Sequence, residues 1–396
     1  MRDKRFIKAA GVLITFFLTG MLNTVLATVT PLMNTQGGVP LLHMGLAVSV
    51  MSASRLIAVI PAGHLADKKS KSGILQIGIA LIFAGALVAG FAPYGFLFYL
   101  AMVLFGTGHA FMDGAANALI TDLYPEKPGG VLNLLHMFFG IGGMLGPLAF
   151  GFLIKQYSNW QYPFLFIGVV AVLIGLFLSV NRYDKTITGI SQGKSKTKAK
   201  NLLNPALLFL CLMMFIMIGS SNTFKSFVNT LFVYRFAVTA MYASTVLALT
   251  NGGVTFGRLL WSMFAEKIGY NRILALGMVG TLITGMGTLL SSTPLIGMIF
   301  AILTGVFMSP FFPISIAIGG MVHPEKKGTL TGLFTVCASL GSMIFPAICG
   351  YLADQSGNIK NAMFILPLSS IIPIILFLTK ARKQLAIQMK DSSNLD

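Results

Sequence analysis

Long apolar segments separated by short polar stretches run through the whole sequence. The apolar runs reach about 20 residues, the length that a helix needs to cross the ~30 Å hydrocarbon core of a bilayer. Their spacing predicts twelve helices, at residues 6–33, 44–65, 73–91, 96–121, 131–154, 162–180, 205–234, 241–264, 273–291, 294–321, 328–352 and 363–379. We therefore predict an all-α membrane protein with twelve transmembrane helices.

A longer polar stretch, residues 182–203, separates the sixth predicted helix from the seventh. It contains the run Gly-Ile-Ser-Gln-Gly-Lys-Ser-Lys-Thr-Lys-Ala-Lys, a composition typical of a flexible linker. The linker predicts two six-helix bundles, residues 1–181 and residues 204–396, the second of which ends in a short tail.

An internal repeat supports this division into two bundles. A shift of 199 residues places Gly20, Asn23 and Thr24 on Gly219, Asn222 and Thr223. The same shift aligns further glycines and prolines: Gly106 with Gly305, Gly142 with Gly341, Pro147 with Pro346 and Gly151 with Gly350. Parallel repeats of this kind hold a transport site between them near the middle of the membrane.

The composition and the placement of charge agree with a membrane protein. Hydrophobic residues make up 55% of the chain and charged residues 10%, against about 25% charged in soluble domains. If the N-terminus is cytoplasmic, 23 of the 28 Lys and Arg residues fall on the cytoplasmic side, which is the positive-inside pattern. We expect a multi-pass protein of the cell membrane with both termini cytoplasmic. The net charge of +17 then needs no nucleic-acid partner.

Polar residues inside the predicted helices fall on single helix faces. His109, Asp113 and Asn117 are spaced four residues apart within 96–121, so they share one face. An acid within an apolar span is a functional-site hypothesis by default. Arg55 lies at a similar depth and is the candidate partner of Asp113. An ion pair keeps the carboxylate ionised, whereas burial without the pair favours its protonated form, so we expect Asp113 and Arg55 to couple transport to protons.

Further polar positions within the helices are candidates for substrate binding. Asn23 follows Thr15 and Thr19 on one face of the first helix, and Lys225 lies between Ser221 and Asn229 on the seventh. The expected substrate-binding residues are Asn23, His109, Asn117, Asn133, His136, Asn222, Lys225 and Asn251. The alternative for these polar groups is hydrogen bonding between helices, and for Lys225 it is a side chain that extends to the outer membrane interface.

The connection after the second predicted helix reads Gly63-His-Leu-Ala-Asp67-Lys68-Lys-Ser-Lys. It resembles the signature of the loop between helices 2 and 3 in the major facilitator superfamily. The resemblance implies the major facilitator fold, with Gly63 packed closely and Asp67 bonded to a neighbouring helix end. We therefore expect Gly63, Asp67 and Lys68 to form a conformational gating loop. The alternative is a charged loop that only sets the topology.

The most specific motif is Asp113-Gly-Ala-Ala-Asn117 followed by Leu132-Asn133-Leu-Leu-His136. It resembles the fucose/galactose/glucose:proton symporter family, as do Phe256-Gly257-Arg258 and the stretch from Phe307 to Gly319. The resemblance implies that Asp113 is the proton or sugar carboxylate and that Asn133 and His136 lie near the sugar. Thr24 stands where such transporters have an acid in the first helix, which leaves sodium coupling as an alternative.

The fifth predicted helix carries Gly142-Gly-Met-Leu-Gly146-Pro147-Leu-Ala-Phe150-Gly151. It resembles the helix 5 motif of drug:proton antiporters, except at Phe150. Since Pro147 and Gly151 recur as Pro346 and Gly350, a packing kink common to both halves explains the motif without an antiport mechanism.

These features favour a secondary transporter that takes up a sugar or a similar small polar solute with protons, by alternating access. The alternatives are proton-coupled efflux of amphipathic drugs and a membrane sensor or scaffold that does not transport. We expect no enzyme activity and no cofactor besides the ion gradient, because no phosphate-binding loop or metal-type cysteine spacing is present. We also expect a monomer in the lipid bilayer, with residues 6–33 retained as an uncleaved first helix.

Overall fold

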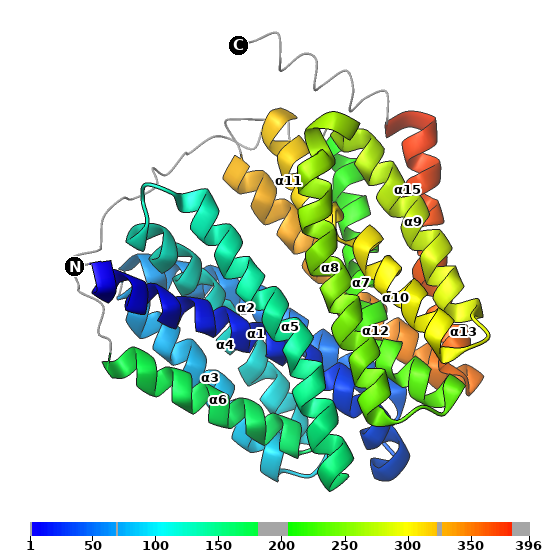
Figure 1. Cartoon of the computed structure of the whole chain (residues 1–396), viewed down its shortest axis with the longest axis horizontal. Helices are drawn as coiled ribbons and strands as arrows, with labels where there is room; N and C mark the ends of the chain where they lie inside the picture. Colours follow the sequence, from blue (N-terminus) through cyan, green and yellow to red (C-terminus); the bar gives the residue numbers. More distant parts are fainter. Residues whose placement is uncertain (1, 69, 181–204, 323–326, 382–396) are drawn as a thin grey trace.

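Helices account for nearly all of the described chain (Figure 1). The computed structural model describes the backbone of residues 2–68, 70–180, 205–322 and 327–381. The first half contains α1 (Arg2–Gly37), α2 (Leu41–Lys68), α3 (Lys71–Phe91), α4 (Phe96–Leu123), α5 (Pro128–Tyr157) and α6 (Tyr162–Val180). The second half contains α7 (Pro205–Phe236), α8 (Ala240–Ile268), α9 (Tyr270–Leu290), α10 (Pro294–Met308), α11 (Phe311–Val322), α12 (Lys327–Ser356), α13 (Ile359–Met363), α14 (Ile365–Ser369), α15 (Ile371–Leu376) and a π-helical turn, Phe377–Ala381. The predicted linker lies outside the described residues.

Two segments predicted as single helices are interrupted. The segment 294–321 is divided into α10 and α11 at Ser309 and Pro310. The segment 363–379 begins earlier, at Ile359, and is divided into α13, α14 and α15, the last two of which contain Pro367 and Pro373. Proline has no backbone N–H and its ring collides with the preceding turn, so the helix breaks at these points. The apolar pattern runs on across each break and conceals it.

Twelve membrane-crossing segments result from these elements. Within the described ranges, eleven are long and apolar enough to cross a bilayer, and two of the eleven are the interrupted segments 294–322 and 359–379. The twelfth is α8, whose second half carries Arg258, Glu266 and Lys267 and is therefore less apolar. The predicted all-α membrane fold is confirmed.

Each half has its own apolar core, and the two cores are built alike. One core consists of residues from α1 to α6, and the other consists mainly of residues from α7 onward. In the first half α4 packs on α2 so closely that a Cβ at Gly106 would collide with the Met51 carbonyl. In the second half a Cβ at Gly305 would collide with the Thr250 carbonyl. Gly305 and Thr250 each lie 199 positions after Gly106 and Met51, so the two contacts are equivalent and the sequence repeat is also a structural repeat.

The two bundles meet mainly at one end of the molecule. We call the side where α1 begins the near side, and the side where α1 ends and α2 begins the far side. In the far half α2 packs against α12 and α5 packs against α8. Ser49 donates to the Met343 carbonyl, and Tyr234 donates to Asn34. The ribbons of the bundles converge toward the bottom of Figure 1 and diverge toward the top.

Asp354 joins the bundles at the far side through a helix N-terminus. Its Oδ1 accepts a hydrogen bond from the Leu41 backbone N–H at 2.9 Å, and its Oδ2 accepts from the Leu42 N–H at 2.7 Å. These amides begin α2 and have no partner within their own helix. The negative charge also lies at the positive end of the α2 dipole, so the contact stabilises the conformation that is closed on the far side.

We predict that Asp354→Asn shifts the population away from this conformation by roughly fivefold, or about 1 kcal/mol, because the amide loses the charge and one acceptor oxygen. The shift is measured by electron–electron resonance between spin labels at Lys155 and Lys360, after replacement of the three cysteines. Glu266→Gln, which removes an exposed carboxylate from α8, is the matched control. An unchanged distance distribution in Asp354→Asn would refute the role of the contact.

Candidate functional site

An ion pair between α2 and α4 forms the centre of the site. Arg55 Nη2 contacts Asp113 Oδ2, and the side chains are 45% and 19% exposed, respectively. Asp113 lies ten residues before the end of α4 at Leu123, about 15 Å along the axis, so its charge is deep within the span. The backbone contact at Gly106, two turns earlier on α4, brings α2 close enough for Arg55 to reach it.

His109 contacts the other oxygen of the same carboxylate. Its Nε2 lies 3.5 Å from Asp113 Oδ1, one helical turn away. The ring is fully buried and 6.4 Å from the ring of Phe139 on α5, and neither of its nitrogens makes a hydrogen bond among the described residues. Asp113 therefore lies between a permanent cation and a titratable imidazole.

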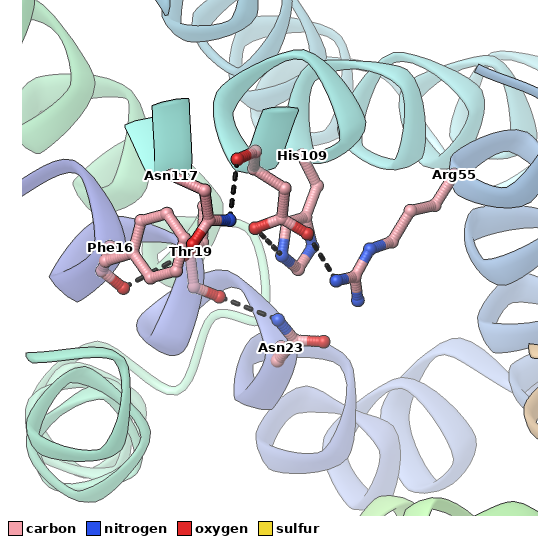
Figure 2. A network of polar contacts seen from close by, with 7 residues as sticks. Phe16, Thr19, Asn23, Arg55, His109 and Asn117 are labelled. Atoms are coloured by element: carbon pink, nitrogen blue, oxygen red, sulfur yellow. Dashed lines mark hydrogen bonds and ion pairs between the residues drawn. The ribbon is translucent and has the colours of Figure 1, made fainter. Parts of the chain in front are cut away.

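Amides of α1 and α4 surround this cluster (Figure 2). Asn117 Nδ2 donates to the Asp113 backbone carbonyl at 2.8 Å, and Asn23 Nδ2 donates to the Thr19 carbonyl at 2.8 Å. Both amide side chains thus use one donor on their own helix, and their Oδ1 oxygens accept no hydrogen bond among the described residues. Asn23 is exposed although it lies near the middle of α1, so it faces a water-accessible region.

One face of α5 continues the site toward the near side. A Cβ at Gly140 or Gly143 would touch Thr255 or Asn251 of α8, so this face is turned to the second bundle. His136 and Asn133 lie one and two turns before Gly140 on the same face, and both are exposed. His136 also packs edge-on against Phe16 of α1 at 5.6 Å. The facing surfaces of α5 and α8 are therefore in contact at the far side and apart at the near side.

The second bundle contributes positive charge and amides. Asn251 is half-buried on α8 and donates to the Leu247 carbonyl at 3.0 Å. Arg258, seven residues further on the same face, is exposed. Its charge acts on His136 across the bundles and on Lys225 of α7. Lys225 is half-buried.

Asn222 makes its hydrogen bond within the second bundle and not with the other residues of the site. Its Nδ2 donates to Ser342 Oγ of α12 at 2.6 Å, within the second bundle. This contact corresponds to the alternative of helix-to-helix hydrogen bonding. Asn222 therefore packs two helices together in this conformation.

The expected gating loop is described only in part. The backbone of α2 extends to Lys68, but the side chains of Asp67 and Lys68 lie outside the described residues. Gly63 is described, and a Cβ there would meet open space. A Cβ at Gly114 of α4 would meet the Gly63 backbone nitrogen at 3.8 Å, so Gly63 lies near α4 within the first bundle. The gating role of Gly63, Asp67 and Lys68 stays a prediction.

Arg258 is a member of the site that the sequence conceals. The count of 23 cytoplasmic basic residues includes Arg258, although it lies within both the predicted helix 241–264 and α8, ten residues before the end at Ile268. A signal was present, because Arg258 shares a helix face with Asn251. The assignment of Arg258 to the cytoplasmic basic residues obscured that signal.

The described residues contain no group of His, Cys, Asp and Glu side chains that could hold a metal ion. Cys349 is buried, whereas Cys211 and Cys337 are half-buried. The constellation consists of one carboxylate, three cations, two imidazoles and several amides between two bundles. Chemically it can exchange a proton and bind a polar solute.

Comparisons with known proteins identify the wider group. A sequence model of the Major Facilitator Superfamily matches residues 12–294 and 210–388. Sodium-dependent glucose transporter 1A of Mus musculus is 24% identical over 379 residues, which cover 85% of this chain and 86% of that protein. Multidrug resistance protein 2 of Bacillus subtilis (strain 168) is 22% identical over 359 residues, covering 87% of both.

A solved structure shows the same fold. The crystal structure of FucP, a transporter of this superfamily in the outward conformation, superimposes with a TM-score of 0.60 at 21% identity. The superposition covers 94% of this chain and 98% of that chain. A further crystal structure describes FucP as the E. coli fucose:proton symporter.

We predict that Arg55→Gln and Asp113→Asn each lower the unfolding temperature, because each leaves one charge of the pair without its partner. The expected loss is about 1–2 kcal/mol, less than for a fully buried pair, since Arg55 is 45% exposed. The double variant should recover part of the loss. Thermal unfolding of the purified protein in detergent measures this, with Glu126→Gln as a control that removes an exposed partner of Arg5. Additive losses in the double variant would contradict the pairing.

Proposed function

The chain belongs to the Major Facilitator Superfamily, and on that premise we propose that it takes up a sugar or similar small polar solute together with protons. The observation that carries this proposal is the cluster of Asp113, Arg55 and His109. Asp113 is the one acid of the described spans that lies far from a helix end. It has two partners of different chemistry, of which one is always charged and the other titratable.

The cluster gives a route for coupling a proton to the solute. While Arg55 contacts Asp113, the carboxylate stays ionised and the pair is neutral overall. A solute that draws Arg55 away leaves the carboxylate in an apolar span, where the protonated form is favoured. Uptake of a proton then accompanies binding of the solute. His109 contacts the second carboxylate oxygen and supplies a neighbouring group that can pass the proton.

The arrangement of the bundles suits alternating access. The bundles are in contact at the far side, whereas His136 and Arg258 are exposed toward the near side. We place the near side in the cytoplasm, because 22 of the 28 basic residues fall there by sequence once Arg258 is counted within α8. The conformation described here is then open to the cytoplasm, in the cell membrane and with both termini inside. Rocking of the two bundles would expose the same groups to the opposite side.

Hydroxyl-rich solutes fit the amides of the site. Asn23 and Asn133 are exposed between helices, and Asn251 is half-buried opposite α5. A carboxamide can both donate to and accept from a hydroxyl group, which a dry site requires. The relative from Mus musculus and FucP carry glucose and fucose in their names, which supports a sugar-like solute. The name of the Mus musculus relative also includes sodium, which supports sodium as the alternative coupling ion.

Drug efflux is the second candidate, supported by the Bacillus subtilis relative and the motif in α5. The structure gives the motif a packing role. A Cβ at Gly142 would collide with the Phe17 carbonyl of α1, and a Cβ at Gly151 would press on Ser244 of α8. Close helix contact therefore explains these glycines without an antiport mechanism. We prefer uptake for this reason.

We predict that Asp113→Asn abolishes accumulation driven by a pH gradient but retains counterflow exchange, because solute binding and rocking do not need the proton. The measurement uses sealed proteoliposomes with an imposed pH gradient and a panel of radiolabelled sugars and lipophilic cations. Asp122→Asn, on the same helix and paired with Lys71, is the matched control.

The outcome also separates the alternatives. Undiminished accumulation in Asp113→Asn would remove this residue from the mechanism. Accumulation that follows a sodium gradient without regard to pH would replace the proton by sodium. Extrusion of lipophilic cations against the gradient would favour the drug exporter.

A further inference from the structure

The charges inside the membrane-spanning segments do not balance. Three cations lie deep in their helices: Arg55 near the middle of α2, Lys225 in α7 and Arg258 in α8. Among the acidic residues that the structure describes, only Asp113 lies at comparable depth. The other acids within the described ranges are near helix ends or in connections, at positions 3, 67, 122, 126, 266 and 354. Asp113 pairs with Arg55, so two deep cations remain without an acid.

Neither Lys225 nor Arg258 has a partner among the described residues. The ion pairs there join Arg5 to Glu126, Arg55 to Asp113, Lys71 to Asp122 and His109 to Asp113. The charge of Arg258 acts on Lys225, so the two cations repel each other. Two unpaired like charges in facing helices are unfavourable in an apolar segment.

The membrane interface cannot take up the charge of Lys225. The residue lies eleven positions before the end of α7 at Phe236, about 16 Å along the axis, which is beyond the reach of one lysine side chain. Its neighbours on the same face are also committed to the protein interior. Ser221 is buried one turn earlier, and Asn229 is buried one turn later, with its Nδ2 3.4 Å from Ser244 Oγ of α8. Lys225 thus faces α8 and the space between the bundles.

Exposure at the near side makes the two cations tolerable in this conformation only. Arg258 is exposed and Lys225 half-buried, so water can solvate them while the near halves are apart. Closing the near side removes that water, and the full cost of two unpaired charges would then apply. A bound anion lowers this cost, because a guanidinium and an ammonium are the two side chains best suited to an oxyanion.

We propose that Lys225 and Arg258 form an oxyanion-binding subsite, and that the transported solute is a hydroxylated organic anion such as a sugar acid or a sugar phosphate. This inference rests on the proposed function and narrows its substrate class. The oxyanion group binds between α7 and α8, and the hydroxyl groups face the amides of the first bundle, where Asn133 and Asn23 are exposed. Binding of the anion is also required before the near side closes.

The test uses the full-length protein in proteoliposomes with saturating internal solute and external tracer. Three sets of solutes are compared: hexuronates and hexonates, hexose phosphates, and neutral hexoses. We expect exchange of one anionic set and none of neutral hexoses, and the active set distinguishes a carboxylate from a phosphate. Lys225→Gln and Arg258→Gln should each raise the KM for the anion by about tenfold or more, through loss of a charge-assisted hydrogen bond.

Two further variants keep the result interpretable. Lys225→Arg preserves the charge and should retain most of the affinity, which separates a lost charge from a misfolded protein. Lys267→Gln removes an exposed cation from the last turn of α8 and should leave the KM unchanged. Exchange of neutral hexoses that is insensitive to Lys225→Gln and Arg258→Gln overturns the anion subsite while leaving sugar uptake intact. Anion exchange without any response to pH would leave the subsite standing and overturn the proton coupling.

Discussion

A carboxylate inside an apolar helix needs a charged or polar partner, because water does not stabilise its charge there. Much of the first bundle is arranged to give Asp113 such partners. Arg55 contacts one oxygen and His109 the other. The contact requires α2 and α4 to approach at backbone distance, which Gly106 permits. A side chain at Gly106 would separate the helices and leave two charges unpaired in the membrane. The packing of the bundle and the chemistry of its site therefore depend on the same contact.

The two bundles repeat one frame but carry different charges. Gly106 on Met51 and Gly305 on Thr250 are equivalent contacts, yet the position equivalent to Asp113 is Phe312. Conversely, the positions equivalent to Lys225 and Arg258 in the first bundle are Leu26 and Val59. The acid is thus found in one half and the two unpaired cations in the other. The two halves therefore share one scaffold but carry charges of different sign at these positions, and the site between them is asymmetric.

Much of this architecture was predictable from local patterns. Runs of apolar residues indicated the spans, and spacing by four residues placed His109, Asp113 and Asn117 on one face. The breaks at Pro310 and within 359–379 were missed, because apolar composition continues across them while the missing N–H acts only on the backbone. The contact of Arg55 with Asp113 could be suggested by depth but not assigned, since the rotation of one helix against another depends on the packing of the whole bundle. The gating role of Gly63, Asp67 and Lys68 stays a prediction, because a sequence encodes both states of a moving protein and one structure contains a single state.

The location of Arg55 and Asp113 has a consequence for the thermodynamics of coupling. Both belong to the same bundle, and rigid rocking of one bundle against the other leaves their separation unchanged. In the proposed mechanism the pair is then opened by the solute that enters the site, so that proton and solute act on the same two side chains. Their coupling is a reciprocal linkage: the factor by which a bound proton changes the affinity for the solute is the factor by which the solute changes the affinity for the proton. Rocking of the bundles determines which side of the membrane the site faces, whereas the ratio of protons to solute molecules is determined within a single bundle.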